Sequence, residues 1–294
     1  MNTMTSSPIS CPEFIPPELA RKLADGRRWL TPCGDGHMVW HEWGRKDHPV
    51  VVLLHGGSGS WTHWLHAIAP LRDAGWRVLA PDLPGMGDST LPPDCIDTDD
   101  LPPYLHAGLA MFKPHPDVRL VGFSFGGMTA ALWLRDFPGD ARQLVLVGAP
   151  GMGIKLPDRL PLKGWRHLAT QEEQDAVHRY NLMALMLHRP ESLDALTLDL
   201  HRHNVERDRM QRRRLSGTPI VADSLPKVQA SVSAIYGEHD ALYLHRLPEV
   251  SAAMPALAPV WGEWHTVAGS GHWVQHEAPE AFNRVLLGTL RALP

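Results

Sequence analysis

A serine held between two glycines is the first pattern in this chain that could carry out a reaction. Residues 122–126 read Gly-Phe-Ser-Phe-Gly and fit the pattern G-x-S-x-G. The apolar run 118–121 before it is typical of a buried strand, and apolar residues recur after it at helical spacing. We therefore expect Ser124 in a tight turn from strand to helix, where glycines give the backbone room and the hydroxyl is exposed as a nucleophile.

Two further residues have the chemistry that a serine nucleophile needs. A serine hydroxyl is weakly nucleophilic at neutral pH, so a base must take its proton and a third group must orient that base. His272 lies in a glycine-rich turn after the last expected strand, and Asp240 follows the strand before it. The carboxyl ends of parallel strands share one edge of a sheet. We therefore predict that Ser124, Asp240 and His272 meet there as nucleophile, orienting acid and base.

Other residues fit the roles of acid and base less well. Asp82 and Asp88 lie in the turn after an earlier strand and rank behind Asp240. His55 and His239 do not occupy the loop after the last strand, so they are weaker candidates for the base. The sequence has no H-E-x-x-H pattern and no cysteine–histidine cluster. We expect neither a metal nor any cofactor.

Acyl transfer also needs hydrogen-bond donors for the negative charge of the tetrahedral intermediate. The backbone N–H groups of Gly57 and of Phe125 are the predicted donors, because one follows His55-Gly56 and the other follows the nucleophile. Residues 55–60 read His-Gly-Gly-Ser-Gly-Ser and could instead bind a phosphate. This alternative ranks low because the segment lacks the lysine of a P-loop and the glycine spacing of a dinucleotide fold.

The segments around these residues alternate between strand and helix. Alternating residues at 29–43 predict a hairpin, and the continuous apolar run 50–54 predicts a central strand. Further strands are expected at 77–80, 118–121, 144–147, 232–236 and 263–267, with helices at 61–74, before 112, after 126, at 247–254 and at 279–292. This rhythm predicts an α/β fold whose central sheet is mostly parallel and has helices on both faces.

The character of the sequence changes after residue 151 and returns near residue 228. Strand-like runs stop, and the intervening residues are helical in pattern, charged and rich in arginine and histidine. We expect a hydrolase-type core at 30–152 and 223–294, with an inserted helical cap at 153–222. Residues 1–29 are expected to be a loosely ordered N-terminal arm with a short helix at 17–23.

The cap holds candidate contacts to a substrate. Residues 182–187 are apolar around a whole helix turn, which favours the core of the cap over a pocket wall, although both can hold together. The basic stretch 202–214 is expected to be mostly a solvated face, with one arginine reaching inward to hold a carboxylate. The predicted substrate contacts are Ser58, Phe123, Leu182, Met186, Arg202 and Trp273.

Composition limits the partners of the protein. The chain has 294 residues, with 28 basic and 32 acidic side chains and a formal charge of -4, so no strong attraction to nucleic acid or an anionic membrane is expected. We expect a small-molecule substrate, and a homodimer stays open. Cys11, Cys33 and Cys95 fit neither a disulfide framework nor a metal site. With no leader-like or membrane-spanning stretch, the cytoplasm is the expected location.

Together these motifs resemble the α/β-hydrolase superfamily over nearly the whole chain after the first thirty or so residues. Within it, residues 55–60, 82–89 and 271–275 resemble the branch that contains the meta-cleavage product hydrolases. The resemblance implies cleavage of a carbon–carbon bond in a dienoate keto acid. Two positions depart from that branch: Phe123 stands where it has asparagine, and Arg202 lies one position from its cap arginine. Ser124 excludes the dehalogenase branch, which needs a carboxylate nucleophile.

Three functions follow, in order of preference. The first is a serine esterase that cleaves a small or medium carboxylic ester through an acyl-enzyme, because of the predicted catalytic triad, the oxyanion hole and the apolar cap domain. The second is the carbon–carbon hydrolase that the resemblance implies. The third is a ligand receptor without turnover, which an intact triad disfavours.

Overall fold

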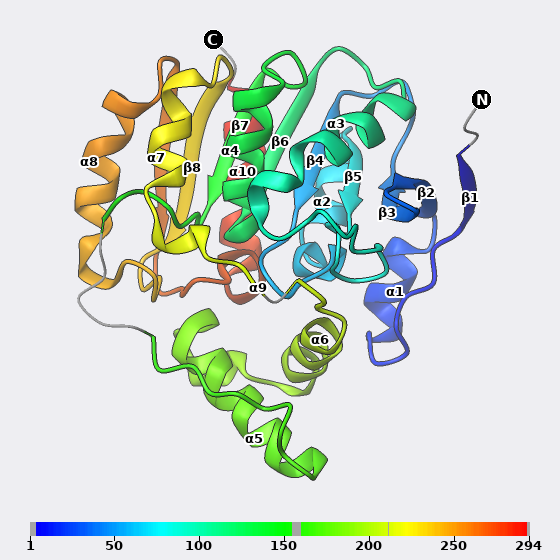
Figure 1. Cartoon of the computed structure of the whole chain (residues 1–294), viewed down its shortest axis with the longest axis vertical. Helices are drawn as coiled ribbons and strands as arrows, with labels where there is room; N and C mark the ends of the chain where they lie inside the picture. Colours follow the sequence, from blue (N-terminus) through cyan, green and yellow to red (C-terminus); the bar gives the residue numbers. More distant parts are fainter. Residues whose placement is uncertain (1–3, 155–159, 211, 293–294) are drawn as a thin grey trace.

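One nine-stranded sheet runs through the residues that the structure, a computed structural model, describes, which are 4–154, 160–210 and 212–292. The strand order is β1-β2-β3-β5-β4-β6-β7-β8-β9 (Figure 1). The strands are β1 (Thr5–Pro8), β2 (Arg27–Cys33), β3 (Gly36–Trp43), β4 (Val50–Leu54), β5 (Arg77–Pro81), β6 (Val118–Phe123), β7 (Gln143–Val147), β8 (Ser231–Gly237) and β9 (Trp261–Val267).

The sheet is antiparallel from β1 through β2 and β3 to β5, and parallel from β5 through β4 to β9. All residues of β4, β6 and β7 are buried, as expected for strands covered on both faces. The predicted mostly parallel sheet is confirmed. Since successive parallel strands point the same way, their carboxyl ends lie at one edge.

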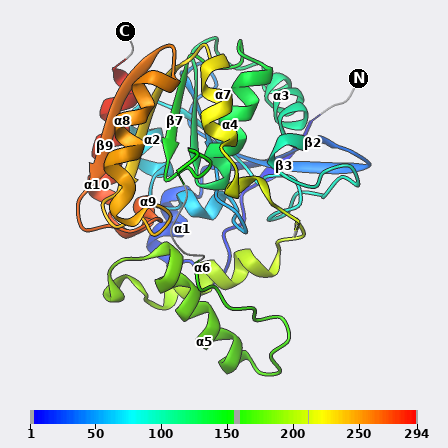
Figure 2. The same cartoon turned by 60° about the vertical axis from the view of Figure 1, so that its left-hand side comes forward.

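Helices cover both faces of the sheet (Figure 2). Buried residues of α3 (Pro102–Met111), α4 (Phe125–Asp136), α7 (Ile220–Ser224) and α8 (Leu247–Leu257) share one core cluster. Residues of α1 (Pro17–Leu23), α2 (Ile68–Asp73) and α10 (Pro279–Arg291) share the cluster on the opposite face, and α9 (Val274–Glu277) precedes α10. Phe282, Leu286 and Leu290 of α10 are buried, as the spacing of its apolar residues predicts.

The helix predicted at 61–74 is two shorter elements. A 3-10 turn, η1 (Trp61–Trp64), is followed by a break and then by α2. Pro70 explains the break, because its ring lacks an N–H group and would clash with the carbonyl four residues earlier. The other short turns are η2 (Thr98–Asp100), η4 (Pro190–Ser192), η5 (Leu215–Gly217), η6 (Leu225–Lys227) and η7 (Leu244–Arg246).

The N-terminal arm is more ordered than its sequence predicts. Residues Thr5–Pro8 pair with the outer edge of β2 and form an edge strand, although all four are exposed. Backbone pairing at an open edge needs no apolar pattern, so the sequence carries no signal for it. The helix predicted at 17–23 is present as α1.

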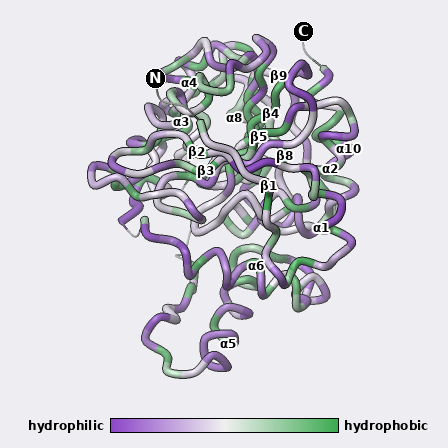
Figure 3. The backbone as a smooth tube through the Cα atoms, turned by 90° about the vertical axis from the view of Figure 1, so that its right-hand side faces the viewer, coloured by the Kyte–Doolittle hydropathy of each residue, from purple (hydrophilic) through white to green (hydrophobic). Residues whose placement is uncertain are grey.

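A helical insertion lies between β7 and β8, below the sheet in Figure 1. It contains α5 (Gln171–Asn181), the π-helical turn η3 (Leu182–Met186) and α6 (Ala195–Glu206). The trace around α5 is mostly hydrophilic in Figure 3, whereas hydrophobic residues concentrate in the sheet and the helices that cover it. The predicted cap boundary at residue 222 falls inside α7, whose buried Val221 packs with the core. Residues 155–159 of the predicted cap lie outside the described residues.

Candidate active site

The turn at Ser124 has a strained backbone, as expected for the predicted nucleophile. Ser124 has φ 51° and ψ -117°, a conformation that side chains rarely adopt, and it joins β6 directly to α4. Two neighbouring glycines are required by close backbone contact. A Cβ on Gly122 would lie 2.4 Å from the Gly126 carbonyl oxygen, and one on Gly126 would lie 2.4 Å from the Leu54 carbonyl oxygen. The G-x-S-x-G spacing therefore follows from packing as well as from conformation.

The structure brings Ser124, His272 and Asp240 together in one hydrogen-bonded chain. Ser124 Oγ lies 2.9 Å from His272 Nε2, and His272 Nδ1 lies 2.9 Å from Asp240 Oδ2 and 3.0 Å from Oδ1. The His272 and Asp240 side chains are 1% and 0% exposed, whereas Ser124 is partly accessible. A carboxylate only accepts hydrogen bonds, so Nδ1 carries the proton and Nε2 is free to accept the serine proton.

Gly148 leaves space for the hydrogen-bonded side chains of His272 and Asp240, and it was not predicted from the sequence. It follows β7 directly and has φ +53°, in the left-handed region that favours glycine. A Cβ at this position would lie 3.0 Å from His272 Nδ1 and 3.1 Å from Asp240 Oδ2. The sequence signal that could have indicated this position is a glycine directly after the predicted strand 144–147.

The two predicted oxyanion donors lie side by side. A Cβ on Gly57 would be 3.5 Å from Phe125 Cβ, so the loop after β4 packs against the first turn of α4. Phe125 is the first residue of α4, and the first amides of a helix have no acceptor within it. Backbone N–H groups at such a position stabilise nearby negative charge.

Buried imidazoles hold the loop after β4 in place. Leu83 N donates to His55 Nε2 at 2.8 Å, and Gly56 N donates to His63 Nδ1 at 3.2 Å. Burial lowers the pKa of His55 and holds the pKa of His63 well below its ordinary value. Both rings are therefore neutral at physiological pH and serve as hydrogen-bonding supports.

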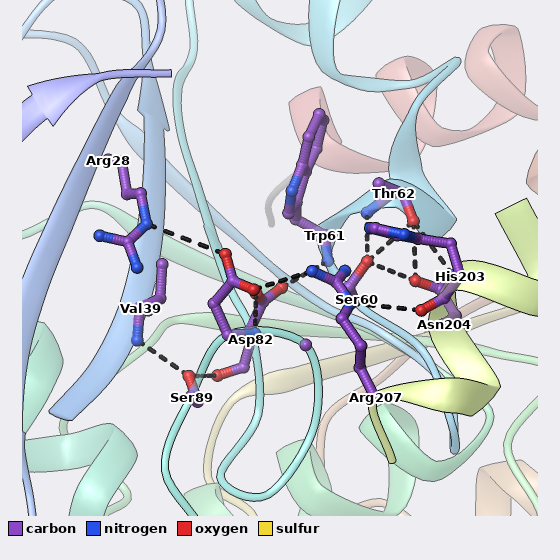
Figure 4. A network of polar contacts seen from close by, with 12 residues as sticks. Arg28, Val39, Ser60, Trp61, Thr62, Asp82, Ser89, His203, Asn204 and Arg207 are labelled. Carbon is purple, nitrogen blue, oxygen red and sulfur yellow. Dashed lines mark hydrogen bonds and ion pairs between the residues drawn. The ribbon is translucent and has the colours of Figure 1, made fainter. Parts of the chain in front are cut away.

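The weaker acid candidates are engaged in structural contacts (Figure 4). Asp82 accepts hydrogen bonds from Trp61 N and from Asp88 N, each at 2.9 Å. Asp88 forms an ion pair with Arg207 at 2.8 Å and lies 4.0 Å from Arg28. These contacts order the turn after β5.

The remaining base candidate, His239, also has another place in the fold. Its side chain is 43% exposed and stacks on the ring of His188, with 3.6 Å between the ring centroids.

A cavity of about 540 Å³ lies between the loop after β4 and the helical insertion. A second hollow, of about 400 Å³, is lined by residues such as Arg45 and Arg72 and by none of the predicted site residues. The described lining of the larger cavity does not include Ser124, Asp240 or His272, and this cavity meets the predicted site at Gly57 and Ser58. Apolar walls come from the insertion, and polar groups come from both parts. The lining consists of Gly57, Ser58, His63, Leu162, Lys163, Gly164, Trp165, Arg166, His167, Asn181, Leu185, Met186, His201 and Val205.

The charge of this lining is positive. Lys163 and Arg166 are the cations, and no carboxylate belongs to the described lining. Burial also lowers the pKa of His201 to about 3. His63, Lys163 and Arg166 were not predicted from the sequence, because nothing in their spacing links them to residues 55–60.

Two of the predicted substrate contacts, Ser58 and Met186, line the cavity. Phe123, Leu182 and Trp273 are fully buried behind the lining. Phe123 lies between two imidazoles, 5.0 Å from the His272 ring and 5.6 Å from the His63 ring. It therefore supports the site from the second layer of side chains.

Arg202 does not take the predicted position at the substrate. Its guanidinium pairs with Asp199 at 2.6 Å and with Asp175 at 3.3 Å, within the insertion. The i,i+3 spacing of Asp199 and Arg202 on α6 brings the two side chains together. We do not carry Arg202 into the proposed site.

The prediction that residues 202–214 form a solvated face is wrong for three arginines. Arg207 pairs with Asp88, Arg209 donates to the carbonyls of Gly87 and Ser89, and Arg213 pairs with Asp208 at 2.6 Å. Arg213 also donates to Ser58 Oγ at 3.0 Å. These arginines fasten the segment to the core, which a run of charges does not reveal because their partners in the core lie over a hundred residues away.

Comparison with known proteins decides the family. A family model described as the alpha/beta hydrolase family matches residues 51–285. The chain belongs to the alpha/beta hydrolase family. The family fold agrees with the sheet order, the buried strands and the elbow at Ser124, and the predicted α/β-hydrolase fold is confirmed.

This alpha/beta hydrolase is similar to several characterised proteins. It is 27% identical over 255 residues to the 2-hydroxy-6-oxononadienedioate/2-hydroxy-6-oxononatrienedioate hydrolase of Escherichia coli K12, covering 82% of this chain and 86% of the relative. The crystal structure of Cfl2 from Burkholderia cenocepacia matches with a TM-score of 0.73 and 25% identity, over 92% of this chain and 97% of the other. The carboxylesterase CesB of Bacillus subtilis matches with a TM-score of 0.76 and 20% identity, over 94% and 96%.

No helix in residues 4–154, 160–210 and 212–292 is long and apolar enough to cross a membrane. The same ranges contain no group of three histidine, cysteine, aspartate or glutamate side chains that could hold a metal ion.

Proposed function

We propose that this alpha/beta hydrolase cleaves small or medium carboxylic esters through an acyl-enzyme on Ser124. The observation that supports the proposal is the hydrogen-bonded chain from Ser124 Oγ through His272 to the buried carboxylate of Asp240. A partly accessible hydroxyl, a neutral acceptor nitrogen and an orienting carboxylate are what acyl transfer to serine requires.

The reaction divides into acylation and deacylation. His272 Nε2 takes the proton of Ser124 as Oγ attacks the carbonyl carbon, and the amides of Gly57 and Phe125 stabilise the oxyanion. His272 then gives its proton to the leaving alcohol oxygen, and an acyl-enzyme remains. Water attacks the acyl carbon while His272 takes its proton, and the acid leaves as the Ser124 oxygen is protonated again.

The cavity supports an acyl or alcohol group of modest size. A volume of about 540 Å³ lies within the usual range for small-molecule sites, and Trp165, Leu185, Met186 and Val205 offer apolar walls. The helical insertion, which supplies most of these residues, acts as the cap in this proposal. Its α5 and α6 enclose the site from the side opposite the sheet.

A second candidate is hydrolysis of a carbon–carbon bond in a dienoate keto acid. The 27% identity with an enzyme named for such dioates favours it, as do Lys163 and Arg166, whose charges suit a carboxylate. The first candidate is preferred because Phe123 replaces the asparagine of that branch and Arg202 is held by Asp175 and Asp199.

A panel of p-nitrophenyl esters and a dienoate keto acid would separate the two candidates. We expect ester turnover to fall at least about 10³-fold in Ser124→Ala, because removal of a triad member leaves only binding and the oxyanion hole. The exposed Ser6 gives the control, Ser6→Ala, which should retain full activity. Turnover that survives in Ser124→Ala would overturn the esterase proposal, and loss of dienoate absorbance without ester cleavage would favour the second candidate.

The third function, ligand binding without turnover, is tested by mass spectrometry of the same mixtures, since stoichiometric binding without product would favour it.

We propose the cytoplasm as the location, supported by the free thiols of Cys11, Cys33 and Cys95. The possible homodimer stays a prediction, which light scattering of the purified protein tests.

A further inference from the structure

We infer that Glu277 is a positioning residue, which ties the cap to the loop that carries His272. The inference rests on the proposed function, because its effect appears in the chemistry of Ser124. Glu277 ends the short helix α9, five residues after His272, and its side chain is 0% exposed. A carboxylate is costly to bury unless hydrogen bonds satisfy it, so its partners show what it holds.

The Glu277 carboxylate accepts hydrogen bonds from three backbone amides. Gly271 N, beside the catalytic histidine, donates to Oε2 at 2.5 Å. From the cap, His188 N donates to Oε1 at 2.9 Å and Arg189 N donates to Oε1 at 2.6 Å. One buried side chain thus joins the His272 loop to residues of the cap more than eighty positions earlier in the chain.

The cap backbone lies directly against this loop. A Cβ on Gly271 would be 2.7 Å from His188 N and 2.9 Å from the Leu187 carbonyl carbon, so only glycine fits there. Trp273 N, on the other side of His272, donates to the Met186 carbonyl oxygen at 2.7 Å. The residues on either side of His272 are therefore both held: Trp273 by the cap segment 186–189, and Gly271 by the Glu277 carboxylate that also binds this segment.

The same cap segment also contacts the loop of Asp240. The His188 ring stacks on His239, the residue before Asp240, with 3.6 Å between centroids. His239 N in turn donates to the Ser270 carbonyl oxygen at 2.9 Å. Residues 186–189 thus touch both loops that supply the His272–Asp240 pair.

This arrangement links substrate contact to catalytic geometry. Met186 lines the cavity, and it is separated by one residue from His188, whose amide binds Glu277. A catalytic group displaced by about 1 Å can lower the rate about 100-fold. Loss of the Glu277 carboxylate should therefore loosen His272 relative to Ser124.

Glu277→Gln tests the inference with little change in side-chain volume. Glutamine has one acceptor oxygen in place of two, so its NH₂ group would face a backbone donor. We expect kcat for a neutral p-nitrophenyl ester to fall about 10- to 100-fold per titrated active site, with KM changed less than about threefold. The phosphonylation rate of Ser124 by a fluorophosphonate should fall in parallel.

The exposed Glu280, three residues later, gives the matched control Glu280→Gln, which should behave as wild type. If Glu277→Gln does not fold, Glu277→Asp is the second variant. Aspartate keeps the negative charge but withdraws the carboxylate by one methylene group. A folded variant with kcat within twofold of wild type would overturn the positioning role while leaving the esterase proposal intact. Wild-type protein without ester turnover or phosphonylation would overturn both.

Discussion

At the scale of single residues, the space around His272 and Asp240 depends on Gly148. Its φ of +53° is one that side chains rarely adopt, and an added Cβ would lie within 3.1 Å of His272 Nδ1 and Asp240 Oδ2, closer than ordinary van der Waals contact. Backbone strain alone would lower stability, whereas steric pressure on His272 would lower the rate. These two effects can be separated.

Gly148→Ala should lose activity beyond its loss of stability. We expect a free energy of unfolding lower by about 1–2 kcal/mol from the left-handed conformation, and kcat lower by about tenfold or more because the new Cβ displaces His272. Urea unfolding and ester kinetics measure the two quantities. Gly75 is the matched control, since it has φ +92° and nothing within 4 Å of an added Cβ. Equal loss of kcat in Gly75→Ala would contradict the steric explanation.

At the scale of elements, the cap is joined to the core by polar side chains. Asn204 of α6 lies over the loop before η1, where its Oδ1 accepts from Ser60 Oγ at 2.7 Å and its Nδ2 donates to Thr62 Oγ1 at 3.0 Å (Figure 4). All three side chains are buried, and the Ser60 and Thr62 hydroxyls also lie 2.8 Å apart, so Asn204 completes a buried hydrogen-bond network. α6 is therefore held in one position relative to the loop of Gly57.

Asn204→Ala should loosen the cap. We expect the free energy of unfolding to fall by about 1–3 kcal/mol, because the Ser60 and Thr62 hydroxyls lose a buried partner, and KM for esters to rise. Faster cleavage in the cap during limited proteolysis would report the same change. Asn283→Ala removes a single bond to the His66 carbonyl within the core and is the comparison. Unchanged KM and proteolysis in Asn204→Ala would contradict this role of Asn204.

At the scale of the whole molecule, we expect two partly buried histidines to make stability depend on pH. Burial lowers the pKa of His201 to about 3, with the nearby His178 adding to the shift. Burial also lowers the pKa of His276 to about 3, with His66 adding to the shift and Asp194 opposing it. In the unfolded chain both rings take up protons near pH 6.5. The unfolded state therefore binds more protons between about pH 3 and 6.5, and stability falls as pH falls through this window.

The free energy of unfolding should drop by about 1.4 kcal/mol per pH unit for each such histidine below pH 6. Urea unfolding at pH 7.5, 6, 5 and 4.5 measures this dependence. His201→Gln should flatten the curve by one histidine, whereas His245→Gln, at an exposed position, should leave the curve unchanged. A wild-type stability that rises on acidification would contradict the sign of the effect.

Much of this architecture is readable from local sequence. Apolar runs of four or five residues predict strands covered on both faces, and β4, β6 and β7 are buried throughout. Two expectations differ from the structure. The helix predicted at 61–74 is interrupted, because the pattern of apolar residues was given more weight than Pro70. The strand β1 was not predicted, because it depends on pairing with β2, more than twenty residues away.

The sequence by itself determined that Ser124, Asp240 and His272 follow strands of a mostly parallel sheet, and that such strand ends share one edge. Only the tertiary structure decided how the cap meets that edge. It places Lys163 and Arg166 on the cavity, holds Arg202 within the cap and fastens Gly271 through Glu277. The reason is physical: strands and their parallel order follow from local periodicity and from the alternation of strand and helix, whereas the docking of an insertion depends on hydrogen bonds between residues far apart in the chain.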